Sequence, residues 1–365
     1  MPSILVITRF LPSLPLPLAI KALIAVLMLV ASQFQLWSRM SSGSVFAPEF
    51  PRPVVVLFNW AGGTILFLAV LQLLLDAAML ASLLLPGDTP AIPLGLRYGM
   101  AGAAAILAAI GVRSAVRVPA LKDVEIGIRG LPAQFDGYTI LQLTDLHISR
   151  LFPAAWTRAM VDRANALDVD LVVVTGDVID GTLAMRRSDV EPLRDLRARD
   201  GVYMSPGNHE YFLGYQEWMR HFADMGMRVL ANAHAVLGRG GDRLVIAGVT
   251  DVSAPATGMP PPDLAAALDG APAMVPVVLL DHQPGPARKA AARGVALQLS
   301  GHTHGGMIPG LDRLVAMGNG GFVSGEYRVD GMALYVNNGT GIWPGFAMRL
   351  ARPSELTRIT LRPAG

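Results

Sequence analysis

LVVVTGDVID, at residues 171–180, joins a run of β-branched apolar residues to a glycine and two acids. A short run of this kind, bounded by turn residues, is typical of a strand that is buried on both faces. The glycine lets the chain turn sharply, so that Asp177 follows directly after the strand. Ligand sites of α/β sheets lie at such strand ends. The stretch therefore predicts an α/β domain with a polar site at the edge of its sheet.

The same arrangement, a strand followed by polar residues, recurs at four other places. Five of the chain's seven histidines lie in these motifs, which is more than chance placement explains. The motifs are DLH with Asp145 and His147, GNHE with Asn208, His209 and Glu210, DHQP with His282, and GHTHGG with His302 and His304.

Short β-rich runs alternate with helical patterns from about residue 119 onward, which predicts an α/β domain over residues 119–365 with helices on the sheet faces. The expected strands are Val124–Arg129, Thr139–Thr144, Leu171–Thr175, Val202–Ser205, Leu244–Gly248, Val277–Leu280, Ala296–Ser300, Leu334–Val336 and Leu356–Leu361. The expected helices are Ala154–Leu167, Val190–Arg199, Gln216–Met225, Leu264–Leu268 and Ala287–Arg293.

The first third of the chain has a different composition. Residues 1–118 contain three acids and seven bases, whereas the rest of the chain contains 25 acids and 23 bases. Three stretches reach the roughly 20 apolar residues that a helix needs to span a bilayer. They lie at about 16–36, within 54–85, and at about 94–116. We expect residues 1–118 to form a membrane anchor with about three transmembrane helices.

Two alternatives bear on this anchor. A cleaved signal peptide at the first stretch fits less well, because a basic start and a small-residue cleavage site are lacking. With three spans, the bases near the membrane favour a cytoplasmic C-terminal domain, but two spans within the middle stretch would reverse that side. Asp76 is interpreted as an acid near a helix end rather than a functional group inside the membrane.

The composition also excludes several classes of function. The chain has no cysteine, which rules out disulfides, thiolate metal sites and cysteine nucleophiles. The excess of bases flanks the apolar stretches, so the net charge of +2 gives no case for nucleic-acid binding. A transporter is disfavoured, since the apolar stretches carry almost no charge that would form a substrate path.

The ordered set DxH, GDxxD, GNHE, a lone His and GHxH resembles the calcineurin-like metallophosphoesterase superfamily over residues 122–365. The tail, with Asn338-Gly339-Thr340-Gly341, is similar to a membrane-anchored bacterial branch. That branch includes phosphodiesterases and UDP-diacylglucosamine pyrophosphatases. The resemblance implies a four-layer α/β/β/α metallophosphoesterase sandwich, preceded here by an all-α transmembrane region.

The resemblance also implies roles for individual residues. The ligands of one metal ion would be Asp145, His147, Asp177 and His304. The ligands of a second would be Asp177, Asn208, His282 and His302. His209 would contact the phosphate and assist the leaving group, with Asp180 orienting its imidazole. Carboxylates, an amide oxygen and imidazoles suit Mn, Fe or Zn, and we favour Mn.

Other residues of the motifs are interpreted differently. Glu210 is expected to be an acid at a helix N-terminus, stabilised by the helix dipole. His221 and His234 lie outside every motif and are interpreted as surface or packing residues. Gln283 and Met307 depart from residues common at these positions in the family, which affects the expected substrate preference. The apolar stretch at 307–323 either packs on the domain or forms a wall for an acyl group.

We therefore expect a two-metal phosphoric ester hydrolase that cleaves a phosphodiester or pyrophosphate bond by in-line attack of a hydroxide held between the metals. Its substrate is expected to be membrane-proximal or lipid-linked. The expected location is the bacterial inner membrane, multi-pass, with a cytoplasmic catalytic domain and an oligomeric state left open. The alternatives are a phosphomonoesterase and, outside enzymes, a non-catalytic membrane-anchored metal-binding module.

Overall fold

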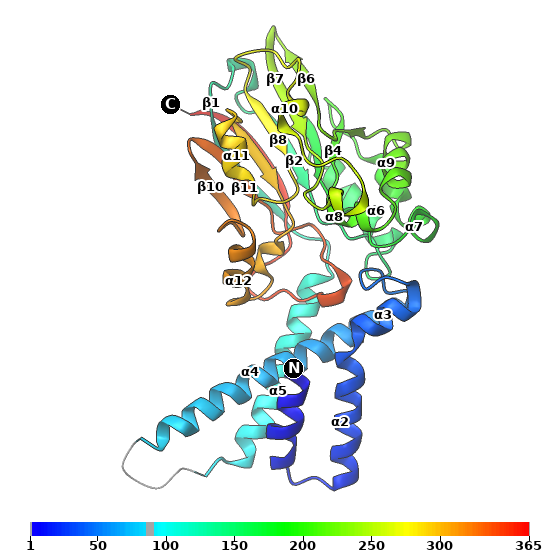
Figure 1. Cartoon of the computed structure of the whole chain (residues 1–365), viewed down its shortest axis with the longest axis vertical. Coiled ribbons are helices and arrows are strands. Elements are labelled where there is room, and N and C mark those ends of the chain that lie inside the picture. Colours follow the sequence, from blue (N-terminus) through cyan, green and yellow to red (C-terminus); the bar gives the residue numbers. More distant parts are fainter. Residues whose placement is uncertain (1, 85–90, 365) are drawn as a thin grey trace. The chain divides into compact units, whose positions relative to one another are not determined.

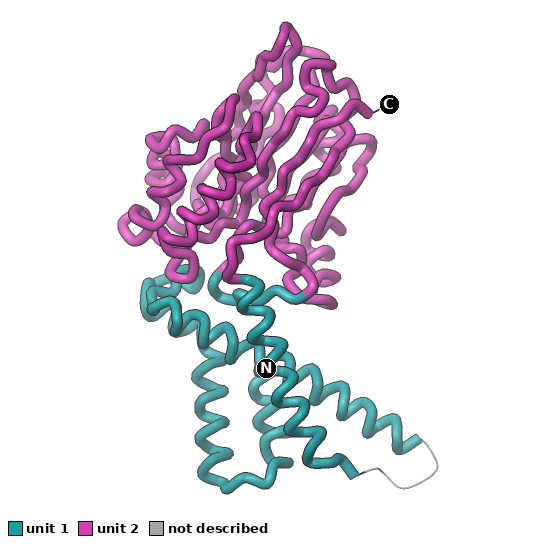
Figure 2. The backbone as a smooth tube through the Cα atoms, turned by 180° about the vertical axis from the view of Figure 1, so that it is seen from behind, with its two compact units in different colours: residues 1–115, 344–350 teal, residues 116–343, 351–365 magenta. Residues whose placement is uncertain are grey.

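The computed structural model describes residues 2–84 and 91–364. The chain forms two compact units, which Figure 2 shows in separate colours. Residues 116–343 and 351–365 make up the α/β unit, and residues 1–115 and 344–350 make up the helical unit. The chain therefore passes between the units at three points, and a short C-terminal segment belongs with the N-terminal helices.

Two mixed six-stranded sheets form the α/β unit. The strands are β1 (Leu121–Arg129), β2 (Thr139–Leu143), β3 (Leu171–Thr175), β4 (Val202–Ser205), β5 (Arg228–Val229), β6 (Ala233–Arg239), β7 (Asp242–Gly248), β8 (Val277–Leu280), β9 (Leu297–Ser300), β10 (Gly325–Val329), β11 (Met332–Val336) and β12 (Leu356–Ala364). The first sheet has the order β1-β12-β2-β3-β4-β5, and the second has the order β10-β11-β9-β8-β7-β6. In both, the central strands that precede the histidine and acid motifs are parallel.

The main core lies between the two sheets. Fully buried side chains from both sheets contact one another there, among them Ile140, Leu171, Ile246 and Leu299. Helices cover the outer faces (Figure 1). The helices of this unit are α6 (Ala154–Asn165), α7 (Leu183–Val190), α8 (Asn208–Phe212), α9 (Tyr215–Asp224), α10 (Leu264–Ala267), α11 (Ala287–Ala292) and α12 (Leu311–Gly318). The predicted α/β/β/α sandwich after a helical region is confirmed.

The central strands follow their predicted bounds closely. Leu171–Thr175, Val202–Ser205 and Val277–Leu280 begin and end where the sequence predicts, and each is buried along its whole length. In such strands the apolar run and the element coincide, because side chains on both faces are covered.

The helix predicted at Val190–Arg199 is wrong. Leu183–Val190 forms α7 instead, and Glu191–Asp195 forms a 3-10 turn with Pro192 at its start. Proline lacks a backbone N–H and disfavours helical geometry in the residue before it, so it ends α7. β6 was not predicted from the sequence; it pairs with β7 across Gly240 and Gly241, two residues of positive φ.

The helical unit contains helices of very different length. They are α1 (Pro2–Leu5), α2 (Leu18–Ser32), α3 (Phe34–Ser42), α4 (Arg52–Ser82) and α5 (Leu94–Ala115). Among the described residues, α4 and α5 are each long and apolar enough to cross a bilayer. The pair α2 and α3 passes this test only together and is bent by 54°. The structure thus offers two candidate spans, or three if the bent pair is one span, and the middle stretch is a single helix.

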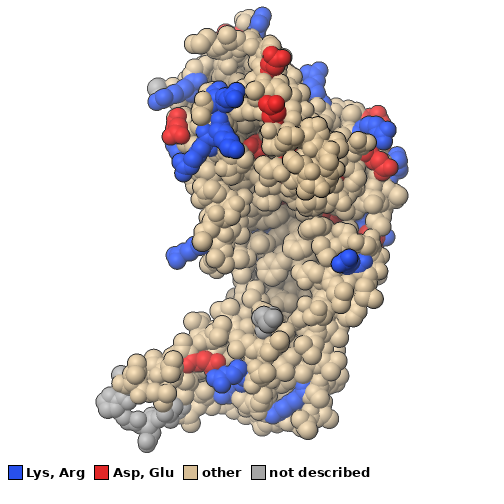
Figure 3. Space-filling view, viewed as in Figure 1, with Lys and Arg blue, Asp and Glu red and all other residues tan. Residues whose placement is uncertain are grey.

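Charged side chains are few over the helical unit on the face drawn in Figure 3. Asp76 of α4 lies 3.1 Å from the guanidinium of Arg9 and accepts a hydrogen bond from Gln72 at 2.8 Å. These contacts give Asp76 a structural role within the unit.

Residues 344–350 pack tightly against α4 and α5 within the helical unit. The buried Asn59 donates from Nδ2 to a carbonyl of the segment at 2.8 Å. Met348 is fully buried. A Cβ added at Gly63 of α4, or at Gly111 of α5, would lie 2.2 Å from the Met348 side chain. The two glycines therefore form the space that this methionine fills.

We predict that Gly111→Val lowers the melting temperature of the full-length protein in detergent, because the new side chain overlaps Met348. Overpacking of this kind costs about 1–3 kcal/mol. Thermal unfolding followed by tryptophan fluorescence measures the change. Gly102→Val is the matched control on the same helix, since a Cβ there meets no described atom within 4 Å. Equal losses in the two variants would contradict this packing, and Met348→Ala should rescue only Gly111→Val.

Candidate metal centre

The residues predicted as ligands and catalytic groups follow the ends of strands of both sheets. The loops after β2 and β3 carry Asp145, His147, Asp177 and Asp180, the start of α8 after β4 carries Asn208 and His209, and the segments after β8 and β9 carry His282, His302 and His304. Seven of them fall into three groups whose candidate ligand atoms lie within 4.8 Å of one another. The groups share His147 and Asp177, so the structure brings them into one cluster.

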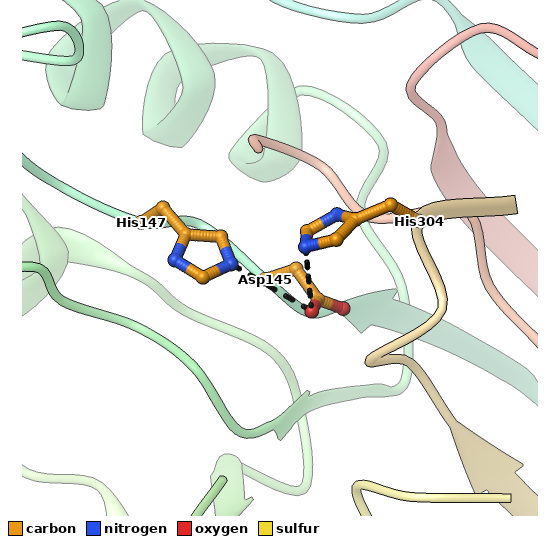
Figure 4. Close-up of side chains that lie close together, drawn as sticks. All are labelled: Asp145, His147 and His304. Atoms are coloured by element: carbon orange, nitrogen blue, oxygen red, sulfur yellow. Dashed lines mark ion pairs between the residues drawn. The ribbon is translucent and has the colours of Figure 1, made fainter. Parts of the chain in front are cut away.

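The first group converges on the carboxylate of Asp145. Nε2 of His147 lies 3.8 Å, and Nε2 of His304 3.7 Å, from the same carboxylate oxygen (Figure 4). Both oxygens accept the backbone N–H of His302, at 3.1 and 3.0 Å. The distances between the side chains are too long for hydrogen bonds and suit three groups that surround a shared cation.

Asp177 lies between the groups. Its Oδ2 is 3.8 Å from Nε2 of His147 and 3.2 Å from Nε2 of His282. Its Oδ1 accepts the backbone N–H of His209 at 2.8 Å. The backbone therefore holds one oxygen while the other faces two imidazoles from opposite sheets. A carboxylate in this position is able to bridge two cations.

Asp180 contacts two imidazoles, although the sequence analysis expected only one of these contacts. It lies 3.1 Å from Nδ1 of His147 and makes a short hydrogen bond to Nδ1 of His209. An acceptor at Nδ1 holds a proton there, so Nε2 of His147 presents its lone pair to the cluster.

The turn that carries Asp180 is held by two buried side chains that the sequence analysis missed. Arg186 of α7 donates from Nε to the carbonyl of Asp180 at 3.0 Å, and Trp218 of α9 donates to the carbonyl of Gly181 at 3.1 Å. Both side chains are fully buried. The helices on the outer face of the first sheet thus position the carboxylate that orients His209.

Several nitrogen and oxygen atoms of the cluster have lone pairs that a metal ion would use and that no protein group uses. Nδ1 of His282 lies 2.7 Å from the carbonyl of Thr175, which leaves Nε2 unprotonated. Within residues 2–84 and 91–364, Nε2 of His147, Nε2 of His282 and Oδ1 of Asn208 are buried without a hydrogen-bond partner. Buried polar atoms nearly always have one. Orphaned nitrogen and oxygen lone pairs beside two carboxylates are the donor set of a divalent cation.

The backbone of the cluster is constrained. Five candidate ligands have left-handed φ angles, namely Asp145 (51°), His147 (46°), Asp177 (54°), His302 (69°) and His304 (50°). This conformation costs a non-glycine residue roughly 1–2 kcal/mol. Side chains also approach this backbone closely: a Cβ at Gly301 would lie 2.2 Å from Oδ2 of Asp145. The first glycine of the GHTHGG motif, Gly301, is therefore needed, because any side chain there would overlap Asp145.

Glu210 joins two of the loops. Its carboxylate accepts the backbone N–H groups of Gly207, Val178 and Asp177 at 2.7, 2.7 and 3.0 Å. It is fully buried, and burial together with Asp177 raises its pKa to about 7. The hydrogen bond from the Gly207 N–H is the glutamate half of a capping box, so the spacing from Gly207 to Glu210 was the available sequence signal. The interpretation of Glu210 as an acid stabilised by the helix dipole therefore leaves out its main role, which is to hold the loop after β3 against the segment after β4.

The carboxylates place the imidazoles in a negative field. Burial by itself lowers the pKa of His147, but Asp180 and Asp145 raise it to about 10. Asp177 likewise raises the pKa of His282 above its ordinary value, against the effect of burial. A field that favours a protonated imidazole also favours a bound divalent cation.

The remaining polar residues singled out in the sequence contact other partners. His221 is buried against Trp218, with ring centroids 6.0 Å apart, rather than at the surface. His234 lies 2.8 Å from a backbone carbonyl of α10. Gln283 donates from Nε2 to both carboxylate oxygens of Asp251, at 3.0 and 3.1 Å.

The sequence profile of the calcineurin-like phosphoesterases matches residues 138–306. The uncharacterized metallophosphoesterase YkuE of Bacillus subtilis is 31% identical over 239 residues, which cover 64% of this chain and 82% of that protein. The chain belongs to the calcineurin-like phosphoesterase family. Membership implies a metal-dependent hydrolase of phosphoesters, and the family binds two divalent metal ions.

In two other relatives, the matched region covers a smaller share of the protein. A transmembrane protein with metallophosphoesterase domain from Danio rerio is 36% identical over 272 residues, or 71% of this chain and 61% of that protein. An uncharacterized metallophosphoesterase of Helicobacter pylori is 31% identical over 247 residues, or 67% of this chain and 64% of that protein. The chain thus matches less than two thirds of the length of both relatives.

We predict that Glu210→Gln lowers the melting temperature by about 5–10 °C, because an amide nitrogen would face a backbone N–H that the carboxylate now satisfies. Thermal unfolding of the full-length protein in detergent measures the shift. Glu217→Gln, at an exposed acid of α9, is the matched control and should change stability by no more than about 0.5 kcal/mol. Similar values for both variants would show that the three hydrogen bonds to Glu210 contribute little.

Proposed function

We propose that residues 119–365 form a phosphoesterase that uses two divalent metal ions, and that residues 1–118 anchor it in a membrane. The ligands of one ion are Asp145, His147, Asp177 and His304. The ligands of the other are Asp177, Asn208, His282 and His302. The observation that carries this assignment is the position of Asp177 Oδ2, 3.8 Å from His147 and 3.2 Å from His282.

His209 and Asp180 are the proposed catalytic residues. Two metal ions bound at the cluster would polarise the phosphoryl oxygens and activate a water for attack on phosphorus. The hydrogen bond that Nδ1 of His209 donates to Asp180 turns Nε2 of His209 toward Asp177, with 3.9 Å between Nε2 and Oδ2. This position would put His209 beside the phosphate of a bound substrate, where its imidazole would donate a proton to the leaving oxygen.

The proposed substrate is a phosphodiester or pyrophosphate that is membrane-proximal or lipid-linked. The apolar helices α4 and α5 and the transmembrane name of the Danio rerio relative support a location at a membrane. We propose that the protein lies in the bacterial inner membrane with its catalytic domain on the cytoplasmic side. Within the family, we propose that it belongs to the membrane-anchored bacterial branch that includes the UDP-diacylglucosamine pyrophosphatases. Mn is the favoured metal, with Fe and Zn as the other candidates for a site of imidazoles and carboxylates.

Two other functions remain as alternatives. A phosphomonoesterase would use the same ligands, so the ratio of diester to monoester hydrolysis distinguishes it. A non-catalytic metal-binding module would need no proton donor, whereas Asp180 holds His209 beside the cluster at the position of one. The intact set of ligands together with His209 favours the hydrolase.

We predict that the full-length protein, stripped of metal with a chelator, hydrolyses bis-p-nitrophenyl phosphate only after Mn, Fe or Zn is restored. Asp177→Asn keeps the size of the side chain but removes the charge shared by the ions. Turnover should fall by at least about 100-fold, since even partners of metal ligands contribute up to that factor. Asp162→Asn, at an exposed acid of α6, is the control. Activity that persists after chelation would contradict the two-metal proposal.

We predict that His209→Ala lowers kcat for bis-p-nitrophenyl phosphate by about 10²–10⁴-fold, the usual contribution of a general acid. His234→Ala removes an imidazole that lies against a backbone carbonyl and should leave kcat unchanged. The same variants are also assayed with p-nitrophenyl phosphate, so that the loss of kcat for the monoester can be compared with the loss for the diester. Full activity of His209→Ala would exclude its proposed role, and faster hydrolysis of the monoester by the unmodified protein would favour a phosphomonoesterase.

A further inference from the structure

Residues 307–323, which include α12, form an apolar surface segment of the α/β unit. Throughout this fully described segment α12 has no buried residue, and Leu314 and Met317 are 64% and 80% exposed. The two side chains are three residues apart and so share one face of the helix. The only charged residues among these 17 are Asp312 and Arg313. A surface so exposed and so poor in charge indicates a contact with something apolar.

The segment is fixed to the loop after β9, which carries two of the proposed metal ligands. A Cβ at Gly306 would lie 2.3 Å from the Cα of Asp312, so the start of α12 packs directly on that loop. At the other end, the hydroxyl of Thr303 donates to the carbonyl of Val323 at 2.8 Å. The exposed face of α12 is therefore held at the edge of the sheets that carries the cluster.

The three points at which the chain passes between the units lie at that same edge. β1 and β12 are parallel to each other and antiparallel to β2, so both begin where β2 ends. β11 is parallel to β9, so both end together. Five residues separate the helical unit from the start of β1 and of β12, and seven follow the end of β11. Five residues reach at most about 18 Å, which keeps this edge within reach of a bilayer that holds α4 and α5.

We propose that α12 contacts the lipid bilayer through Leu314 and Met317, so that the metal centre opens at the membrane surface. The inference rests on the proposed membrane anchoring. Leu and Met beside the cationic Arg313 suit the boundary between acyl chains and headgroups. A short tether gives a high effective concentration, so a contact of two side chains suffices. A lipid-linked phosphoester then reaches the metals while its chains stay in the bilayer.

The absence of cysteine from the chain allows a direct test with single-cysteine variants of the full-length protein. Leu314→Cys and Met317→Cys are labelled with an environment-sensitive fluorophore and reconstituted into phosphatidylcholine vesicles, with or without lipids that carry a quencher at the headgroup or along the acyl chain. Leu73→Cys, at an exposed position of the candidate span α4, is the lipid control. Met274→Cys is the solvent control, since Met274 is 100% exposed and precedes β8 at the opposite edge of the sheet.

Loss of fluorescence at positions 314, 317 and 73, with no loss at 274, is the expected result. Quenching at 73 but not at 314 or 317 would overturn the contact of α12 while leaving the membrane anchor in place. A label at 314 that is shielded from water but not quenched would also overturn it, because α12 would then lie against protein. If position 73 is not quenched, the membrane anchoring fails and this inference fails with it. Each labelled variant is compared with the unlabelled protein by thermal unfolding, so that a folding defect is recognised.

Discussion

The burial of ionisable side chains at one edge of two sheets is the constraint on which the α/β unit depends. Asp145, His147 and Asp180 are fully buried, and a buried charge is tolerated only beside opposite charge or hydrogen-bond donors. The carboxylates and imidazoles supply opposite charge and hydrogen bonds to one another only in part. Among the described residues, Nε2 of His147 and of His282 find no hydrogen-bond partner. Divalent cations would complete the set.

Much of the local structure serves this cluster. Left-handed backbone at five candidate ligands turns their side chains inward, at a cost that the surrounding core must offset. The parallel strands beneath them are buried along their length and provide that rigidity. Glu210 then fixes the loop after β3 to the loop after β4 through three backbone N–H groups. The precision of the site therefore comes from the backbone as much as from the ligands.

The sequence predicted the candidate site better than it predicted the whole fold. Each motif follows a strand whose apolar run marks its end, so the positions of His147 and Asp177 were predictable from local pattern alone. The helix after Asp180 was misplaced because an amphipathic pattern continued past Pro192, where the backbone ends the helix. β10 and α12 were not predicted. Each is short and partly exposed, so neither has the apolar run or the buried face by which hydrophobic periodicity identifies a strand or a helix.

By itself the sequence determined the family, the identity of the candidate ligands and the presence of long apolar helices, since each of these depends on local composition and spacing. The tertiary structure decided which atoms face one another: that Asp180 serves two imidazoles, that Arg186 and Trp218 hold its turn, and that Met348 fills a space between Gly63 and Gly111. These are contacts between residues far apart in the chain. They follow from how strands and helices pack, which spacing along a sequence does not encode.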